Sequence, residues 1–289
     1  MRRTWIACLC GSFIGLAAQA QSTELWRSWN QPVEPFRIID TIHYVGANDI
    51  ASYLITTPEG HILLDGGFPE TAAIIRDSIS KLGFRLEDVK LLINSHAHFD
   101  HSGGLAELAE ASGARVVISA PDADAIESGG KTDFFLGQTE AAHFPPLKVD
   151  RRIRDREQVR QGPVTLTAHV TAGHTPGCTS WAMQVEGEGG PLDVVFVCST
   201  SVLPDYRLLE RPSYEGIRAD FEATFARLKS LPCDVFLAPH TRFFKMDDKL
   251  ARRKAGGANP FIDPASYREY VAGSERQFRE HLAREQQAD

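Results

Sequence analysis

Residues 95–104 read Ser-His-Ala-His-Phe-Asp-His-Ser-Gly-Gly, which places three imidazoles and one carboxylate within six consecutive positions. The apolar run 91–93 comes directly before this stretch and is typical of a buried strand. Leucines at helical spacing follow it at residues 105–108. The stretch therefore marks the place where a buried strand ends and a helix begins.

The spacing of these side chains indicates a metal site. In extended backbone, residues two apart point the same way, so we expect His96, His98 and Asp100 to converge. His101 is expected to face the other way as the chain turns into the helix. A hydrophobic core needs no such concentration of imidazole and carboxylate, whereas a metal ion does.

Two further histidines follow other predicted strands. His174 lies in the turn sequence Gly-His-Thr-Pro-Gly at 173–177, and His240 follows the apolar run 235–238. Imidazole and carboxylate ligands without thiolate favour zinc in an open, catalytic site. Six such ligands, in two sets of three, predict two zinc ions about 3.5–4 Å apart.

Short β-branched runs and helical patterns alternate along the remaining sequence. Two similar halves, joined near residues 149–158, predict an α/β fold in which two sheets pack together with helices outside, a four-layer αββα sandwich. The turn-rich stretch 129–146 is expected to be a surface loop. The predicted strands are 37–45, 52–56, 61–65, 91–95, 115–119, 164–170, 181–185, 193–198 and 234–238. The predicted helices carry Ile74, Ile75 and Ile79; Leu105 and Leu108; Ile217, Phe221, Phe225 and Leu228; and Tyr267, Tyr270, Val271, Phe278 and Leu282.

The first twenty residues have the pattern of a secretory signal. Arg2 and Arg3 precede an apolar stretch, and Ala-Gln-Ala at 18–20 fits a cleavage site. The apolar stretch is shorter than the ~20 residues of a membrane span, so a retained anchor is the weaker interpretation. We expect residues 1–20 to be a cleaved signal peptide, and residues 21–289 to form a single domain in the periplasm without membrane attachment.

Charge excludes one class of partner. The chain has 31 basic and 38 acidic residues, a net charge of −7, and losing Arg2 and Arg3 moves the charge to −9. Nucleic-acid binders usually carry a basic face, and this sequence has no cluster of that kind. Nucleic acid is therefore not an expected partner.

The pattern of metal-binding residues resembles the metallo-β-lactamase superfamily. His-x-His-x-Asp-His, then Gly-His-Thr-Pro-Gly, then a distant histidine at a strand end is the arrangement of that family, and Leu-Leu-Asp-Gly-Gly at 63–67 is similar to a further family motif. The resemblance covers essentially the whole mature chain. It implies that one zinc is bound by His96, His98 and His174 and the other by Asp100, His101 and His240.

The resemblance also assigns Asp65 a role beside the metal ligands. It implies that this carboxylate orients a ligand histidine, as carboxylates near metal sites commonly do. The alternative is a turn aspartate before two glycines.

The strand end at 197–201 narrows the resemblance to one subclass. Lactonases, glyoxalase-type thioesterases and phosphodiesterases of the superfamily usually place a metal-bridging aspartate there, and this sequence has none. Two subclasses of β-lactamase have a cysteine ligand at this position; the third has serine, with a histidine after the metal aspartate. Alignment with the third subclass puts Ser199 at that position, Cys198 one residue earlier, and His101 in the zinc site.

The same resemblance implies residues for substrate and catalysis. Ser199 and Ser201 would hold the substrate carboxylate, Tyr206 would lie near the carbonyl oxygen, and Trp29 and the 134–144 loop would line the groove. Asp100 would tether the second zinc and orient the nucleophile. For the serines and loop aromatics, the alternatives are a turn cap and a cover over the core.

Three cysteines remain after signal cleavage, which allows at most one internal bridge. Cys178 follows the His174 turn, and Cys198 ends a strand whose tip is expected to reach the same site. We predict a Cys178–Cys198 bridge that leaves Cys233 as a buried thiol. Three buried thiols are the competing interpretation.

The expected function is that of a monomeric zinc-dependent β-lactamase. It would hydrolyse penicillins, cephalosporins and carbapenems with a water activated by zinc, whose pKa zinc lowers to about 7. A lactonase or thioesterase on the same fold is the alternative, and a non-catalytic zinc-binding protein is less favoured because no ligand is missing.

Overall fold

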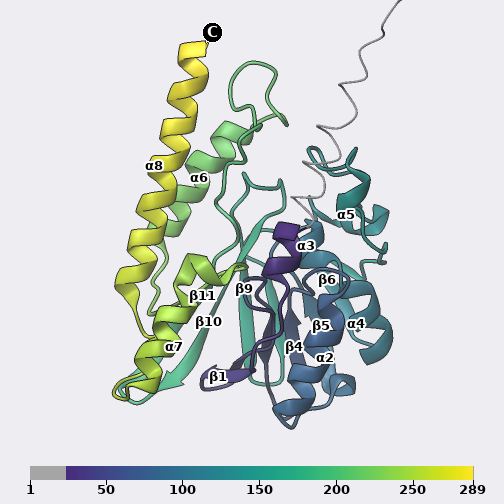
Figure 1. Ribbon diagram of the computed structural model, residues 1–289, viewed down its shortest axis with the longest axis vertical. Coiled ribbons are helices and arrows are strands. Elements are labelled where there is room, and N and C mark those ends of the chain that lie inside the picture. The colour runs from purple at the N-terminus through teal and green to yellow at the C-terminus, as the bar shows by residue number, and fades with distance from the viewer. Residues whose placement is uncertain (1–23, 289) are drawn as a thin grey trace, which may run out of the picture.

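Two β-sheets pack face to face, and helices cover the outer face of each (Figure 1). The computed structural model describes residues 24–288, so the predicted signal peptide at residues 1–20 lies outside the described residues. The layers are those of the predicted αββα sandwich. No described helix is both long enough and apolar enough to cross a membrane.

The first sheet is mixed. Its strands run in chain order, antiparallel from β1 to β4 and parallel from β4 to β7. The central strand β5 is buried on both faces except at Lys90, as its apolar sequence requires. The bounds are β1 Phe36–Ile39, β2 Ile42–Tyr44, β3 Tyr53–Ile55, β4 His61–Leu64, β5 Val89–Ile93, β6 Arg115–Ser119 and β7 Arg151–Ile153.

The second sheet has the order β12-β11-β10-β9-β8, antiparallel except between β11 and β12. Strand β9 alternates buried and half-buried side chains over its first five residues, which is the period expected of a strand with one face in the core. The bounds are β8 Gln158–Gln161, β9 Val164–Val170, β10 Thr179–Gly187, β11 Gly190–Phe196 and β12 Val235–Leu237.

Each sheet buries its outer face against its own helices. Ile75 and Ile79 of α2 pack in one cluster with Leu63 and Leu92 of the first sheet. On the other side, Phe221 of α6 contacts Phe278 of α8 at a ring distance of 5.4 Å. The helices are α2 Thr71–Lys81, α3 Phe99–Ser102, α4 Leu105–Ser112, α5 Ala123–Ser128, α6 Ile217–Ser230, α7 Met246–Lys254 and α8 Pro264–Ala288, with short 3-10 turns at Leu86–Asp88, Glu140–Ala142 and Thr241–Phe244; residues 24–29 are also helical.

Three predictions about the elements need correction. The predicted strand 37–45 is a hairpin, because Asp40 has a φ of 43° and turns the chain between β1 and β2. The join between the halves lies at 149–158 as predicted, but strands β7 and β8, the edge strands of the two sheets, were not predicted there. Helices α5 and α7 were not predicted, since both are short segments with few apolar residues.

The stretch 129–146 contains only a 3-10 turn, so it is a loop as predicted. It is not wholly on the surface, however, because Phe144 is buried against the first sheet's helices and Phe134 packs against the main core. Other loops leave the ends of β4, β5, β9, β11 and β12, and they carry the predicted site residues.

Candidate metal centre

The histidine-rich stretch leaves β5 and turns into the short helix α3. Because α3 begins at Phe99, Asp100 lies in helical backbone, and the prediction of extended backbone through Asp100 is wrong. His101 does not face away either, since its ring lies 4.5 Å from that of His96. A helical turn thus brings together side chains that the strand pattern would have separated.

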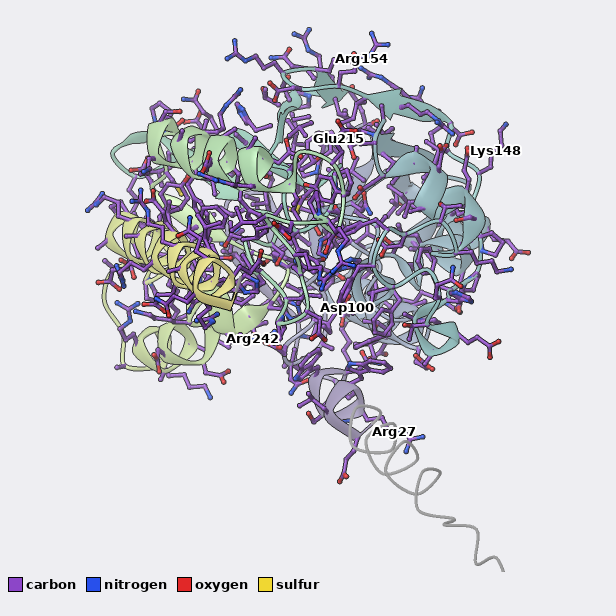
Figure 2. The ribbon with its side chains drawn as sticks, turned by 90° about the horizontal axis from the view of Figure 1, so that it is seen from above. Arg27, Asp100, Lys148, Arg154, Glu215 and Arg242 are labelled. Carbon is purple, nitrogen blue, oxygen red and sulfur yellow. A yellow bond between two sulfur atoms is a disulfide. The ribbon has the colours of Figure 1, made fainter. Side chains whose placement is uncertain are left out.

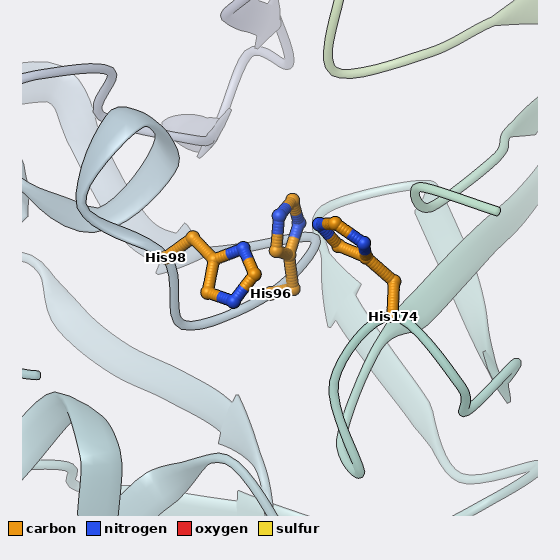
Figure 3. Close-up of side chains that lie close together, drawn as sticks. All are labelled: His96, His98 and His174. Atoms are coloured by element: carbon orange, nitrogen blue, oxygen red, sulfur yellow. The ribbon is translucent and has the colours of Figure 1, made fainter. Parts of the chain in front are cut away.

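His96, His98 and His174 form the first group. One nitrogen from each ring lies within 4.8 Å of the other two, and all three side chains are buried. His96 and His98 come from the loop after β5, while His174 comes from the turn between β9 and β10 (Figure 3). Three converging imidazole nitrogens can bind one metal ion at bond lengths of about 2.0–2.1 Å.

Asp100 and His101 cluster with His96, one possible ligand atom of each lying within 4.8 Å of the others, and His240 lies beside them. We call Asp100, His101 and His240 the second group; it lies near the centre of the view in Figure 2, where Asp100 is labelled. Asp100 Oδ2 lies 3.3 Å from His101 Nε2 and 3.6 Å from His240 Nε2. The rings of His101 and His240 are 4.9 Å apart. One carboxylate oxygen and two ring nitrogens therefore converge beside the first group.

Partnerless polar atoms show that these donors fit a cation. His101 is fully buried, and neither of its ring nitrogens makes a well-aligned hydrogen bond to a described residue, although Asp100 Oδ2 lies 3.3 Å from Nε2. A buried polar atom without a partner costs about 1–3 kcal/mol, so a bound metal ion accounts for the cluster better than packing does.

Each of the five imidazoles has a polar neighbour on the nitrogen that faces away from the two groups. Such contacts fix the orientation of metal-binding rings. They leave Nδ1 of His98 and Nε2 of the other four rings directed toward the two groups. The pairs are His96 Nδ1 with Ser95 Oγ at 2.9 Å, His174 Nδ1 with the Ser201 carbonyl at 2.8 Å, His240 Nδ1 with Asp49 Oδ2 at 3.2 Å, His98 Nε2 with Asp133 Oδ2 at 3.7 Å and His101 Nδ1 with Asp65 Oδ2 at 3.9 Å.

Burial keeps most of these rings neutral, the form that binds metal. It lowers the pKa of His98 to about 4 and the pKa values of His174 and His240 to about 3. Burial acts on His101 in the same direction, but the Asp100 and Asp65 carboxylates together outweigh it and raise the pKa of His101 above its ordinary value.

Asp65 follows β4 and accepts a hydrogen bond from the Ser95 backbone N–H at 2.6 Å. Steric constraints explain why glycine follows Asp65 at position 66. A Cβ on Gly66 would come within 2.7 Å of the Leu105 backbone nitrogen, so only glycine allows this loop to pack against the start of α4. The loop after β4 thus touches both the β5 loop and α4, and its carboxylate faces His101.

Cys178 and Cys198 form a disulfide with a Cα separation of 5.8 Å, as predicted, and Cys233 is a buried free thiol. The sulfur atoms of both bridged cysteines lie within 4.8 Å of a ring nitrogen of His96. A disulfide sulfur is not a thiolate, so this third group of close side chains is not a metal site.

The predicted substrate-binding residues surround the same loops. The Trp29 ring lies 5.6 Å from the His240 ring, with edge-to-face geometry. Ser199 Oγ accepts a hydrogen bond from the Ser201 backbone N–H at 3.3 Å. Ser199 is buried and Ser201 is half-buried.

Tyr206 is buried, and its hydroxyl donates to the His174 carbonyl at 2.7 Å. Because the single O–H is used there, this geometry gives Tyr206 a role in supporting the His174 turn and does not support a contact with a substrate carbonyl. Phe135 of the 129–146 loop packs on the Tyr206 ring at 4.7 Å.

Sequence reasoning did not find three carboxylates beside the metal-binding loops. Asp49 contacts His240 and Asp133 faces His98, as described above. Asp122 accepts hydrogen bonds from the Ala97 N–H, the Thr175 hydroxyl and the Gly177 N–H at 3.0, 2.8 and 2.7 Å. In the sequence all three look like ordinary turn aspartates, and no spacing signal distinguishes them.

Residues 45–240 match the family model of the metallo-β-lactamase superfamily. The structure is similar to that of a metallo-β-lactamase from Legionella gormanii, with 36% sequence identity, a TM-score of 0.87 and coverage of 89% of this chain and 98% of that one. It is also similar to a subclass B3 metallo-β-lactamase of Bradyrhizobium japonicum, with 42% identity, a TM-score of 0.84 and coverage of 90% and 97%.

Curated relatives match over shorter stretches. An N-acyl homoserine lactonase from a Bacillus species is 27% identical over 160 residues, which are 47% of this chain and 59% of that protein. A hydroxyacylglutathione hydrolase from Methylobacterium nodulans is 29% identical over 106 residues, 37% of this chain and 32% of that protein. The chain thus spans about a third to three fifths of the length of these relatives. Together with the family match and the histidine-rich groups, these similarities establish that the chain belongs to the metallo-β-lactamase superfamily and is a metal-dependent hydrolase.

Proposed function

We propose that this hydrolase is a zinc-dependent β-lactamase that opens the cyclic amide of penicillins, cephalosporins and carbapenems and so confers antibiotic resistance. It would bind two zinc ions, one with His96, His98 and His174 and the other with Asp100, His101 and His240. The donor set supports zinc, because imidazole and carboxylate without thiolate suit an open catalytic zinc site.

Zinc, when bound, supplies a Lewis acid and a water that is acidic enough to act as a nucleophile at neutral pH. The chain's own residues orient the reactants. Asp100 Oδ2 lies against both His101 and His240, and Asp100 is proposed to direct the attacking water. Ser199 and Ser201 are proposed to donate hydrogen bonds to the substrate carboxylate, and Trp29 to line the groove beside His240.

The observation that carries the proposal is the chemistry of the strand end after β11. Residues 197–201 contain no carboxylate, and Cys198 is bonded to Cys178, so this segment offers neither a bridging aspartate nor a thiolate. Ser199 remains at the position that distinguishes the third subclass of zinc β-lactamases. The similarity to two solved metallo-β-lactamases over nine tenths of the chain supports the same substrate class.

A lactonase or thioesterase is the second candidate, because the curated relatives include an N-acyl homoserine lactonase and a hydroxyacylglutathione hydrolase. The missing aspartate after β11 argues against it. A non-catalytic zinc-binding protein is less favoured, since the sequence lacks none of the six proposed ligands.

The disulfide supports the proposed location. Disulfides persist in oxidising compartments, the bacterial periplasm among them, and are rare in the cytosol. We therefore place the mature chain, residues 21–289, in the periplasm after removal of the signal peptide. A monomer is supported by the small number of exposed large hydrophobic side chains in the described chain, which are Leu25 and Ile262.

The test is hydrolysis of a carbapenem by the purified mature protein, with and without a chelator, beside a homoserine lactone and a thioester. We expect turnover of the carbapenem that the chelator abolishes and added zinc restores. His174→Ala should lose this activity, while His169→Ala on the preceding strand, β9, should keep it, because His169 contacts Arg227 and no metal-binding residue. Turnover of the lactone or thioester with no turnover of any β-lactam would contradict the proposal.

A further inference from the structure

Asp49 lies in the loop between β2 and β3, and this loop is hydrogen-bonded to the segment that carries His240. The Asp49 carbonyl accepts from the Thr241 N–H at 2.9 Å, and the Pro239 carbonyl accepts from the Ala51 N–H at 2.9 Å. The Thr241 hydroxyl donates to the Asn48 carbonyl at 2.7 Å. A loop of the first sheet thus holds the segment after β12 of the second sheet.

The Asp49 carboxylate is largely buried, with 14% of its side chain exposed, and it faces three consecutive residues. His240 Nδ1 lies 3.2 Å from Oδ2, and the Arg242 N–H donates to Oδ1 at 3.2 Å. The Thr241 hydroxyl, which donates to the Asn48 carbonyl, also lies 3.2 Å from Oδ1. The Arg242 guanidinium forms an ion pair with the same carboxylate. Contacts to both oxygens therefore hold the carboxylate against His240.

The contact between Asp49 and His240 Nδ1 differs from those that the other four imidazoles make through the nitrogen facing away from the two groups. His96 and His174 face a hydroxyl and a backbone carbonyl, which are neutral. The carboxylates beside His98 and His101 lie farther away, at 3.7 and 3.9 Å. Among the described residues, His240 is the imidazole of the two groups whose outer nitrogen has a carboxylate at hydrogen-bond distance.

Asp49 also connects His240 to the groove wall. Its backbone N–H donates to the Trp29 carbonyl at 3.1 Å. The Arg242 guanidinium that it pairs with lies 4.9 Å from the centre of the Trp29 ring. Figure 2 labels Arg242, which follows the β12 end of the second sheet. His240, Trp29 and Arg242 are thus held around one carboxylate.

We propose that Asp49 is a positioning residue for the second metal group: it accepts the Nδ1 proton of His240, directs Nε2 toward Asp100, and holds Trp29 and Arg242 in register with that metal. The inference rests on the proposed function of the Asp100–His101–His240 group as a zinc site. A carboxylate in this place raises the basicity of the ring nitrogen that binds the metal and fixes the ring's orientation. Removing its charge should therefore weaken the second metal more than the first.

The experiment measures zinc binding to the metal-free full chain by competition with a chromophoric chelator. Asp49→Asn keeps the shape of the side chain and removes the charge. We expect one of the two zinc steps to lose roughly 10–100-fold in affinity, the range seen when such outer contacts are removed, with the other step unchanged. Asp49→Glu, which restores the charge, should recover part of the loss.

A control variant separates this role from other effects. Asp150→Asn removes a carboxylate that accepts the Val116 N–H at 2.9 Å outside the site, and should leave both zinc steps unchanged. Unchanged zinc binding by Asp49→Asn, or an equal loss in Asp150→Asn, would overturn the proposal.

A measurement on the unmodified protein covers the case in which Asp49→Asn does not fold. Long-range proton–nitrogen NMR spectra of the zinc-loaded chain, with His240 assigned, should show the proton on Nδ1. A proton on Nε2 would refute the assignment. Both readouts are independent of turnover, so a protein that binds zinc as expected but hydrolyses no β-lactam would refute the proposed function and leave the role of Asp49 intact.

Discussion

Asp122 joins the two loops that supply the first metal group. Its carboxylate is buried and accepts one hydrogen bond from the His96–His98 loop, through Ala97, and two from the His174 turn, through Thr175 and Gly177. The Ser119 hydroxyl adds a further bond to the Gly177 carbonyl at 2.6 Å. Because one buried acceptor group serves both loops, the separation of the two loops depends on it.

Asp122→Asn should destabilise the metal-free protein by about 1–3 kcal/mol. The amide places a donor where an oxygen now accepts the Ala97 N–H, which leaves a buried group without a partner. Urea unfolding followed by circular dichroism measures the change. Asp150→Asn is the matched control, because its carboxylate is more exposed and bonds a single backbone N–H. An equal loss in both variants would mean that Asp122 has no special role at these loops.

The proposed metal ligands were predictable from the sequence, whereas the residues that orient them were not. Four of the six proposed ligands lie within His96–His101, and this local density is itself the signal. Asp49 meets His240 across 191 positions of the chain, and Asp122 meets Thr175 across 53. A single aspartate in a turn carries no information about such distant partners, so only the folded chain identifies them.

The elements were predicted best where a β-branched run is bounded by turn residues. Strands β6 and β9 have the predicted bounds, 115–119 and 164–170. The hairpin of β1 and β2 was predicted as one strand, because its alternation of apolar residues continues through a turn without glycine. Helix α7 was missed because Met246 and Lys249 are its buried side chains, and a buried lysine gives no apolar signal.

Burial of the Lys249 ammonium lowers the free energy of unfolding, and an apolar side chain at this position would remove that cost. It is fully buried between α7 and α8, with its ammonium 3.3 Å from the Ser266 hydroxyl, and burial lowers its pKa to about 8. Lys249→Met should therefore stabilise the protein at pH 7, by about 3 kcal/mol if the full shift counts, at 1.36 kcal/mol per pKa unit. Lys254→Met, on an exposed position of the same helix, should change stability by less than about 0.5 kcal/mol.

The pH dependence of the stability difference tests whether the buried Lys249 charge causes it. The pKa of Lys249 is lower in the folded state than its ordinary value of 10.5, so between about pH 8 and pH 10.5 the unfolded chain binds more protons than the folded one. Stability due to this group then rises with pH across that window. The difference between Lys249→Met and the unmodified protein in urea unfolding should shrink from pH 7 to pH 10. A difference that is independent of pH would assign the gain to packing alone.

The two halves of the molecule each provide only part of the metal centre. His96, His98, Asp100 and His101 follow β5 of the first sheet, whereas His174 and His240 follow strands of the second. Neither proposed zinc ion has a complete set of ligands within one half. Bound metal therefore connects the two sheets, and its binding free energy adds to the stability of the folded state.

Removal of the metal should lower the melting temperature of the whole domain in one transition. Zinc at 100 times its dissociation constant stabilises by about 2.7 kcal/mol, which corresponds to roughly 5–10 °C for a domain of this size. Scanning calorimetry of the zinc-loaded protein, with and without a chelator, measures the shift. The melting temperature of the His174→Ala variant should fall less when the metal is removed, because the first zinc then has ligands from the first sheet alone. An equal shift in His174→Ala, or none in the unmodified protein, would show that the metal does not link the halves and that the hydrogen bonds between the Asp49 and His240 loops hold them together without it.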